Sequence, residues 1–128
     1  MDNLADTMPF SRLMGVNVTH ADRDLIKGEL AVREDLCTTN GILHGGATMA
    51  FADALGAIGA SLNLPEGAKG TTTIESKTNF LGAAPVGGIV RAESRPLSVG
   101  RRVTVWQTSI VREDGKPVSL TIQTQLFL

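Results

Sequence analysis

Hydrophobic and polar residues alternate along the end of the chain, residues 118–128. Such a period of two predicts a β-strand with one apolar and one polar face. The apolar positions on one side are Val118, Leu120, Ile122, Leu126 and Leu128. The polar positions on the other side are Ser119, Thr121, Gln123 and Gln125. We expect this polar face to be solvated or to lie against a partner subunit.

The rest of the second half of the chain also has the composition of strands. β-Branched and Thr-rich segments separated by turns predict strands over residues 71–81, 89–97 and 99–112. Asp114 and Gly115 predict a hairpin turn before the last strand. In the first half, the pattern predicts a short helix over the first dozen residues, strands over 15–19 and 25–32, and polar turns over 33–41.

Between these strand regions, a segment that begins at Gly45 predicts a helix that is apolar on nearly all sides. The apolar positions are Ala47, Met49, Ala50, Phe51, Ala52, Ala54, Leu55, Ala57, Ile58, Ala60 and Leu62. A helix of this kind has no solvent face and must be enclosed by other elements. The segment Leu-Pro-Glu-Gly at residues 64–67 ends it.

One buried helix and a series of long antiparallel strands indicate an α+β fold. A curved antiparallel sheet wrapped around one central buried helix satisfies both patterns. The open edges of such a sheet favour pairing with a second copy of the chain.

Length and composition narrow the classes of protein that fit. The chain has 128 residues, so we expect one domain over residues 1–128. Its 12 Lys and Arg against 13 Asp and Glu argue against a nucleic-acid-binding protein, which carries a basic excess. The single cysteine excludes an internal disulfide framework and fits a reducing, cytoplasmic location.

Neither a membrane span nor a leader is expected. The stretch over residues 45–64 is long enough to cross a membrane, but it contains Asp53, Asn63 and several Gly and hydroxyl residues. The first eleven residues carry Asp2 and Asp6 and lack a basic start followed by an apolar run, so they do not resemble a secretory signal.

Candidate chemistry begins where the apolar helix begins, at residues 41–46, Gly-Ile-Leu-His-Gly-Gly. The first N–H groups of a helix have no intrahelical partner and bind anions or polarised carbonyl oxygens. Glycines let a ligand approach the backbone closely. The alternative is a glycine-rich turn packed against a strand. A phosphate loop is excluded because no Gly-Lys-Ser/Thr follows.

Asp53 is the only charged residue between His44 and Glu66. An unpaired carboxylate is costly to bury, so Asp53 must be hydrogen-bonded, face a cavity or have a shifted pKa. Its helical neighbours Met49, Ala50, Gly56 and Ala57 are mostly small and would leave room for a substrate. The alternative is a structural Asp that caps a neighbouring loop.

The distance between these two features suggests a site shared by two subunits. Asp53 follows Gly45 by eight residues, about 12 Å along a helix at 1.5 Å per residue. One small reacting group can hardly contact both on the same helix. If they act together, they come from different subunits of a symmetric oligomer.

These residues resemble a known family. Gly41-x-x-His44-Gly45-Gly46 with an acid nine residues after the His is similar to the hotdog-fold acyl-CoA thioesterases, in the PaaI-like and 4-hydroxybenzoyl-CoA thioesterase branch. The stretch Thr-Ile-Glu-Ser-Lys-Thr-Asn-Phe-Leu at residues 73–81 resembles the family's strand after the central helix. The resemblance implies a hotdog fold and hydrolysis of an acyl-CoA thioester to a free acid and coenzyme A.

The resemblance also implies roles for residues of the site. The backbone N–H of Gly45 would polarise the thioester carbonyl, with Gly46 supporting the turn and His44 positioning the thioester. Asp53 from the partner subunit would attack the carbonyl or activate a water. Thr73 stands where relatives often carry a Ser or Thr that holds the water or the acid. His44 alternatively serves only as a turn residue bonded to the backbone.

Several further residues are candidates for binding the substrate. Thr38 stands where many relatives carry Asn or Gln, and Asn40 is near that position but out of register. Met49 and Ala50 are expected to line the acyl pocket. Two arginines on predicted strands are candidates for the coenzyme A phosphates, namely Arg91 and Arg101. Since Arg101 and Arg102 are adjacent on a predicted strand, only one of them can face a given ligand.

Two other functions on the same scaffold stay open. An acyl-thioester hydratase or dehydratase would use His44 as its base, and a non-catalytic acyl-CoA-binding module would bind without turnover. No cofactor is expected beyond the coenzyme A of the substrate. The two histidines and one cysteine lack metal-ligand spacing, so no metal site is expected. The partners expected are the acyl-CoA substrate and further copies of the chain, as a homodimer or homotetramer.

Overall fold

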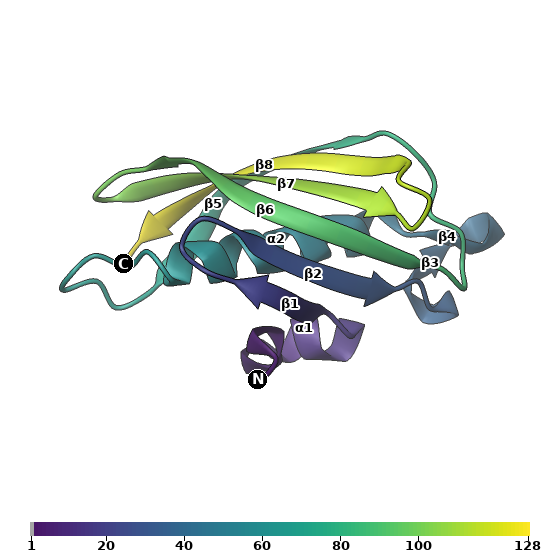
Figure 1. Ribbon diagram of the computed structural model, residues 1–128, viewed down its shortest axis with the longest axis horizontal. Helices are drawn as coiled ribbons and strands as arrows, with labels where there is room; N and C mark the ends of the chain where they lie inside the picture. The colour runs from purple at the N-terminus through teal and green to yellow at the C-terminus, as the bar shows by residue number, and fades with distance from the viewer. Residues whose placement is uncertain (1) are drawn as a thin grey trace.

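A computed structural model describes residues 2–128, and in it a curved antiparallel sheet covers one long helix (Figure 1). The helix is α2 (Gly45–Ser61). The sheet has six strands in the order β1-β2-β6-β7-β8-β5. These strands are β1 (Asn17–Ala21), β2 (Ile26–Ala31), β5 (Thr71–Phe80), β6 (Ile89–Val99), β7 (Val103–Arg112) and β8 (Pro117–Phe127).

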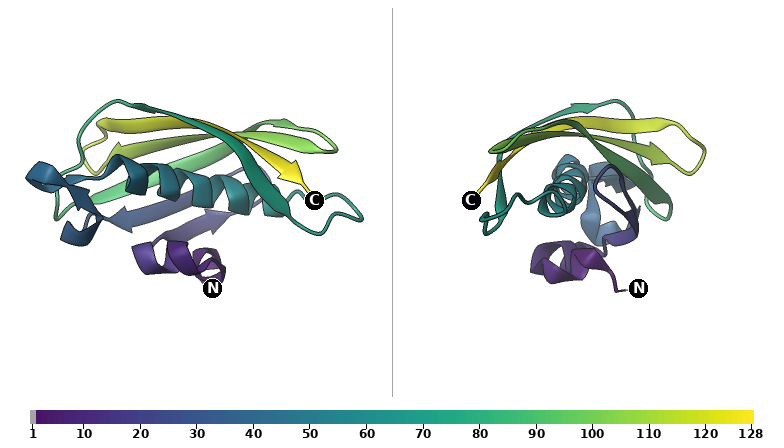
Figure 2. Two further views of the ribbon diagram at one scale, coloured as in Figure 1. Left: turned by 180° about the vertical axis from the view of Figure 1, so that it is seen from behind. Right: turned by 60° about the vertical axis from the view of Figure 1, so that its left-hand side comes forward.

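The remaining elements lie on the side of α2 away from the sheet and at the start of α2. Seen end-on, the sheet arches over α2, and the N-terminal helices lie on the side away from the sheet (Figure 2). These are the 3-10 turn η1 (Leu4–Thr7) and α1 (Pro9–Met14). The segment before α2 contains two 3-10 turns, η2 (Glu34–Leu36) and η3 (Thr39–Gly41), and a small two-stranded sheet of β3 (Cys37–Thr38) and β4 (Ile42–Leu43).

The predicted α+β arrangement is confirmed, with shifts at the element ends. The short N-terminal helix, the two early strands, the central helix and the hairpin at Gly115 all form. A tight turn over residues 100–102 was not predicted. It separates β6 from β7, so the prediction that places Arg101 and Arg102 on a strand is wrong. The Gly100 N–H instead closes the turn on the Val103 carbonyl at 2.8 Å.

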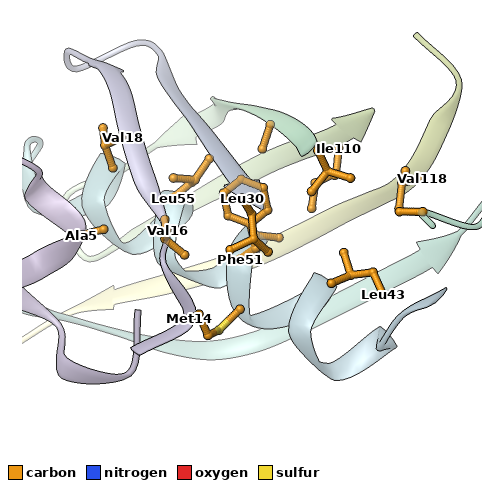
Figure 3. Close-up of a cluster of buried hydrophobic side chains, with 14 of the residues drawn as sticks. Ala5, Met14, Val16, Val18, Leu30, Leu43, Phe51, Leu55, Ile110 and Val118 are labelled. Atoms are coloured by element: carbon orange, nitrogen blue, oxygen red, sulfur yellow. The ribbon is translucent and has the colours of Figure 1, made fainter. Parts of the chain in front are cut away.

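Apolar side chains of α2 and the concave face of the sheet form the core (Figure 3). Phe51 and Leu55 of α2 are fully buried. They pack in one cluster with Leu30 of β2 and Ile110 of β7, and with Met14 from the end of α1. Burying a side chain such as Phe or Leu contributes about 1.5–3 kcal/mol each. This cluster fixes α2 against the sheet.

The polar face of β8 is not solvated, contrary to the sequence-based expectation. Ser119, Thr121, Gln123 and Gln125 are all buried, on the concave face that covers α2. Of the apolar positions of β8, Leu120, Ile122 and Leu126 face outward and are half-buried, whereas Val118 at the start of the strand belongs to the core. Hydrophobicity alone gave the wrong face because polar side chains can be buried when they bond to one another.

The expectation that α2 lacks a solvent face is also only partly met. One stripe of the helix keeps some exposure, at positions three and four residues apart. The stripe consists of Gly46, Met49, Ala50, Asp53 and Ala57. Asp53 lies in its middle.

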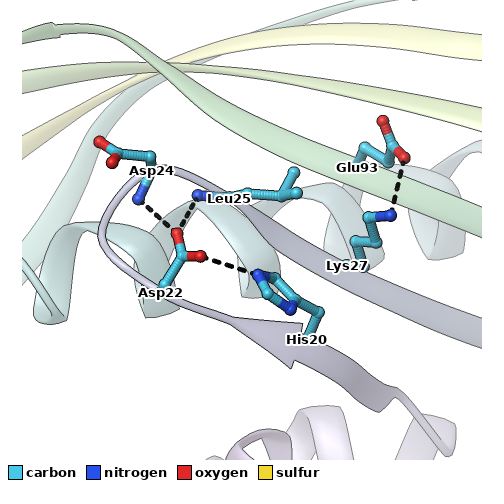
Figure 4. A network of polar contacts seen from close by, with 6 residues as sticks. All are labelled: His20, Asp22, Asp24, Leu25, Lys27 and Glu93. Atoms are coloured by element: carbon cyan, nitrogen blue, oxygen red, sulfur yellow. Dashed lines mark hydrogen bonds and ion pairs between the residues drawn. The ribbon is translucent and has the colours of Figure 1, made fainter.

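The β1–β2 turn is held by polar contacts at the surface (Figure 4). The Asp22 carboxylate accepts hydrogen bonds from the N–H groups of Asp24 and Leu25, at 2.8 and 2.9 Å, and lies 2.8 Å from His20 Nε2. The bond from the Asp24 N–H, together with that from His20, holds the pKa of Asp22 below its usual value. Beyond the turn, Lys27 pairs with Glu93 across β2 and β6 at 3.6 Å.

None of the helices within residues 2–128 has the length and apolar character needed to cross a membrane.

Candidate active site

The start of α2 has backbone N–H groups available for a ligand. His44 is the N-cap, and its Nδ1 accepts a hydrogen bond from the Gly46 N–H at 2.7 Å. The Thr48 N–H bonds to the His44 carbonyl at 3.0 Å. In the described part of the chain, the N–H groups of Gly45 and Ala47 have no hydrogen-bond acceptor. The helix dipole gives these N–H groups the partial positive charge that a carbonyl oxygen prefers.

The ring of Phe80 lies against this helix start. A Cβ added at Gly45 would be 3.2 Å from the tip of the Phe80 ring, so the glycine allows the ring to approach the backbone. Phe80 ends β5 and is 55% exposed. The last residue of β5 therefore adjoins the first residue of α2.

Asp53, two turns along the same helix, is held by side chains from β5 and β8. Its Oδ1 accepts a hydrogen bond from the Thr73 hydroxyl at 2.6 Å and another from Gln123 Nε2 at 3.1 Å. Gln125 Nε2 donates to the Thr73 hydroxyl. Asp53 itself is half-buried. Of the three alternatives expected for this carboxylate, the structure shows hydrogen bonding, with the Thr73 hydroxyl as one of its two donors.

Gly56 does not leave room for a substrate, contrary to the sequence-based expectation. A Cβ at Gly56 would collide with the carboxamide of Gln123. The space beside Asp53 on this side is therefore filled by a side chain of β8, and the glycine serves the packing of Gln123.

The other predicted binding residues lie at different distances from this region. Met49 and Ala50 lie on the exposed stripe of α2, beside Asp53. Thr38 lies on β3 and is exposed. Asn40 occupies the turn between β3 and β4 with a positive φ of 66°.

The two candidate phosphate-binding arginines are not brought close to Asp53 within one subunit. Arg91 alternates along β6 with buried Val90 and Ala92, so it faces the outer side of the sheet, where it pairs with Glu29 at 3.0 Å. Arg101 lies in the exposed β6–β7 turn.

A cavity of about 360 Å³ adjoins His44. Its walls come from α1, the segment before β3 and the first turn of α2. They consist of Phe10, Leu13, Met14, Arg33, Asp35, Leu36, Cys37, His44 and Ala47. Mainly apolar concave sites of this size are typical of small-molecule pockets.

No group of three or more His, Cys, Asp or Glu side chains in residues 2–128 is arranged to hold a metal ion.

Comparison with known families decides the class of this protein. Residues 40–119, which contain the helix start, Asp53, Thr73 and most of the sheet, match the thioesterase superfamily. The chain belongs to this superfamily. It is a thioester hydrolase with the hotdog fold, as the resemblance implied.

Relatives of this thioesterase cover most of the chain. It is 31% identical over 122 residues to 1,4-dihydroxy-2-naphthoyl-CoA thioesterase 2 of Arabidopsis thaliana, covering 91% of this chain and 76% of that protein. It is 32% identical over 104 residues to the proofreading thioesterase EntH of Klebsiella pneumoniae, covering 80% and 74%. The E. coli PaaI protein from the phenylacetic acid degradation operon has the same fold, with a TM-score of 0.87 at 16% identity over 96% and 86% of the two chains.

The sequence did not point to every side chain around the acid of this thioesterase. The alternation along the last strand places Gln123 and Gln125 on a solvated or subunit-facing surface, and Phe80 enters only as part of a strand motif. The sequence does contain a signal for these residues. Gln123 and Gln125 stand at alternate positions of one strand, and so both can face Asp53, the lone carboxylate of the buried helix. The hydrophobic pattern alone does not reveal it.

Proposed function

We propose that this protein hydrolyses an acyl-CoA thioester to a free acid and coenzyme A, with Asp53 of one subunit and the Gly45 N–H of a second subunit acting on the same substrate. The observation that carries the proposal is the position of Asp53. It is the only acid of α2, it is held by Thr73 and Gln123, and it lies on the one exposed stripe of the helix.

The arrangement of β5 over α2 supports a shared site. Phe80 at one end of β5 lies over Gly45, and Thr73 near the other end bonds to Asp53. Within residues 2–128, β5 pairs only with β8, so its other edge is open. If two copies pair antiparallel along this edge, Phe80 of one copy lies toward Thr73 of the other. The helix start of one copy is then brought toward Asp53 of the second.

The groups of the proposed site match the charge changes of thioester hydrolysis. The N–H of Gly45 would stabilise the negative charge on the carbonyl oxygen as the carbon is attacked. Asp53 would either attack this carbon itself or remove a proton from the attacking water. If Asp53 attacks, the carbon–sulfur bond breaks to give a mixed anhydride and the coenzyme A thiolate, and water then hydrolyses the anhydride to the free acid and restores the Asp53 carboxylate. If Asp53 activates water, the water oxygen adds to the carbon and the carbon–sulfur bond breaks directly. In both routes the thiolate takes up a proton.

His44 fits this reaction better as a hydrogen-bond donor than as a base. Its Nδ1 already accepts the Gly46 N–H, so a neutral ring carries its proton on Nε2. Such a ring can donate to the thioester but has no free lone pair for a proton. This weighs against a hydratase that uses His44 as its base.

An aromatic acyl group is the substrate class that we propose. The cavity next to His44 has apolar walls from Phe10, Leu13 and Met14 and a volume suited to one or two rings. A relative that covers nine-tenths of this chain is named for its action on 1,4-dihydroxy-2-naphthoyl-CoA. For the coenzyme A phosphates, Arg91 and Arg101 remain candidates, with Arg101 the one that carries no ion pair among the described residues.

The test is a panel of acyl-CoA substrates assayed with a thiol-detecting reagent. We expect the highest kcat/KM with benzoyl- or naphthoyl-CoA and a lower value with acetyl-CoA. Asp53→Asn should abolish thiol release, while coenzyme A binding measured by calorimetry is retained.

Three results would overturn the proposal. Full activity of Asp53→Asn would exclude the acid from the reaction. Hydration of an enoyl-CoA without thiol release, lost in His44→Ala and kept in Asp53→Asn, would favour the hydratase. Binding without thiol release across the whole panel would favour the binding module.

A further inference from the structure

Three side chains form a hydrogen-bonded chain that ends at Asp53. The Thr71 hydroxyl bonds to Gln125 Oε1 at 3.0 Å, Gln125 Nε2 bonds to the Thr73 hydroxyl, and the Thr73 hydroxyl bonds to Asp53 Oδ1 at 2.6 Å. Thr71 and Thr73 lie on β5, and Gln125 lies on β8 in register with Thr73. Gln125 is completely buried.

The direction of every bond in this chain follows from the carboxylate. An ionised Asp53 can only accept, so the single hydroxyl proton of Thr73 points to it. The Thr73 oxygen then accepts from the amide of Gln125, whose own oxygen accepts from Thr71. All three donors are therefore directed toward the acid, and hydrogen bonds aligned in this way strengthen one another.

Gln123 supplies a second donor to the same oxygen. Its Nε2 is 3.1 Å from Asp53 Oδ1 and 3.5 Å from the Asp53 backbone carbonyl. The side chain is completely buried against Gly56, and its own Oε1 has no partner within residues 2–128. An unsatisfied buried amide oxygen costs stability. Gln123 therefore lowers the stability of the fold at the position where its amide donates to Asp53.

Both donors bond to Oδ1, whereas Oδ2 has no hydrogen-bond donor among the described residues. We propose that Gln123 and Gln125 are positioning residues that fix Asp53 through Oδ1 and leave Oδ2 as the oxygen that reacts. The inference rests on the proposed function, and it applies equally whether Oδ2 attacks the thioester carbon or takes a proton from water.

No charged side chain of the sheet competes with this arrangement inside one subunit. Most charged residues of the strands packed over α2 alternate with less exposed positions and face outward, namely Lys27, Glu29, Glu75, Lys77, Arg91, Glu93 and Arg95. Arg112, at the end of β7, is bonded to Asp114 and to the Ala83 carbonyl. His44, the titratable group on the same helix, is bonded to the helix start. The neutral amides and hydroxyl are thus the groups that orient the carboxylate.

Gln123→Met and Gln125→Met test the inference, since methionine keeps the length of the side chain and removes the donor. A freely rotating carboxylate presents Oδ2 poorly, so kcat should fall about ten- to a hundredfold while KM changes little. Gln123→Met should keep or raise the unfolding temperature, because the unsatisfied amide oxygen is removed.

Thr108→Val is the matched control. It removes a buried hydrogen bond to Ser94 on the same face of the sheet, at 2.8 Å, without touching Asp53. It should lower the unfolding temperature and leave kcat and KM unchanged.

Two results would overturn the inference while the proposed function stands. One is an Asp53-dependent activity whose kcat is the same in both methionine variants as in the native protein. The other is a fall in kcat that merely follows a loss of folded protein, as in Thr108→Val. Activity that survives Asp53→Asn would instead remove the proposed function itself.

Discussion

At the scale of single residues, the site depends on glycines and on buried amides as much as on the acid. Gly56 is the clearest case, because the carboxamide of Gln123 occupies the position that a Cβ would take. At Gly56, α2 has no side chain, and the Gln123 side chain of β8 fills this space. The contact between Asp53 and Gln123 exists only because of this absence.

Gly56→Ala should disturb both stability and activity. The added methyl group displaces Gln123, and overpacking of this kind costs about 1–3 kcal/mol of unfolding free energy. Since Gln123 bonds to Asp53, kcat should fall as well. Urea denaturation and thiol release measure the two effects.

Gly70→Ala is the control for this change. A Cβ at Gly70 meets nothing within 4 Å, and the residue does not have a positive φ. A Gly56→Ala protein with the stability and kcat of Gly70→Ala would show that Gln123 relocates without consequence.

The sequence revealed some residues of the site and not others, for physical reasons. Asp53 stood out because a single charge in an apolar helix must be accommodated. His44 and Gly45 stood out because a helix start exposes N–H groups. Gln123 and Gln125 did not, since their alternation along a strand defines two faces but does not show which face is covered.

At the scale of elements, the strand and helix types were predicted well and their packing less well. Periodicity and turn residues located α2 and the β7–β8 hairpin. The turn between β6 and β7 was missed because Arg101 and Arg102 were interpreted as strand residues. The buried polar face of β8 was missed because its partners come from β5 and α2, which are distant in sequence.

The contact of α1 with the segment before α2 depends on Arg33. Its guanidinium donates to the carbonyls of Met14 and Leu13 at the end of α1, at 2.8 and 3.1 Å, and pairs with Asp35 at 3.0 Å. Both carbonyls belong to the unsatisfied end of a helix. Arg33 thus joins two walls of the cavity next to His44.

Arg33→Ala should loosen α1 without unfolding the sheet. We expect faster amide hydrogen exchange at residues 11–16 and a higher KM for aromatic acyl-CoA, with kcat nearly unchanged. Arg12→Ala is the control, because the Arg12 side chain makes no hydrogen bond within the described residues. Equal exchange in the two variants would contradict the role given to Arg33.

At the scale of the whole molecule, the open edge of β5 and the exposed stripe of α2 lie where a second copy can cover both. A single copy holds Asp53 and the Gly45 N–H at separate turns of one helix. The proposed site is therefore incomplete in one subunit and complete in two.

Subunit mixing tests this arrangement. Asp53→Asn removes the acid. Gly45→Pro removes the N–H at a helix position that tolerates proline and adds a ring next to Phe80. Each variant alone should be inactive. Co-expressed in equal amounts they should regain about a quarter of the native activity, because half of the dimers are mixed and each mixed dimer has one intact site.

Gly45→Ala is the control, because it keeps the N–H and adds a methyl group against Phe80. It should be active on its own and therefore need no complementation. Its activity separates the loss of the donor from crowding against Phe80. Activity of the mixture no greater than the sum of the two parents would place both groups in the same subunit.

The position of Trp106 determines the intrinsic fluorescence of the protein. It is the only tryptophan in a chain without tyrosine, it is completely buried, and its Nε1–H bonds to Thr104 Oγ1 at 2.9 Å. It faces Gln123 across the β7–β8 ladder and lies against Gly59 of α2. Almost all intrinsic fluorescence of the protein therefore arises from one indole next to the hydrogen-bond network. Its emission can report, without an added label, on both the unfolding of the sheet and the state of the buried amides beside Asp53.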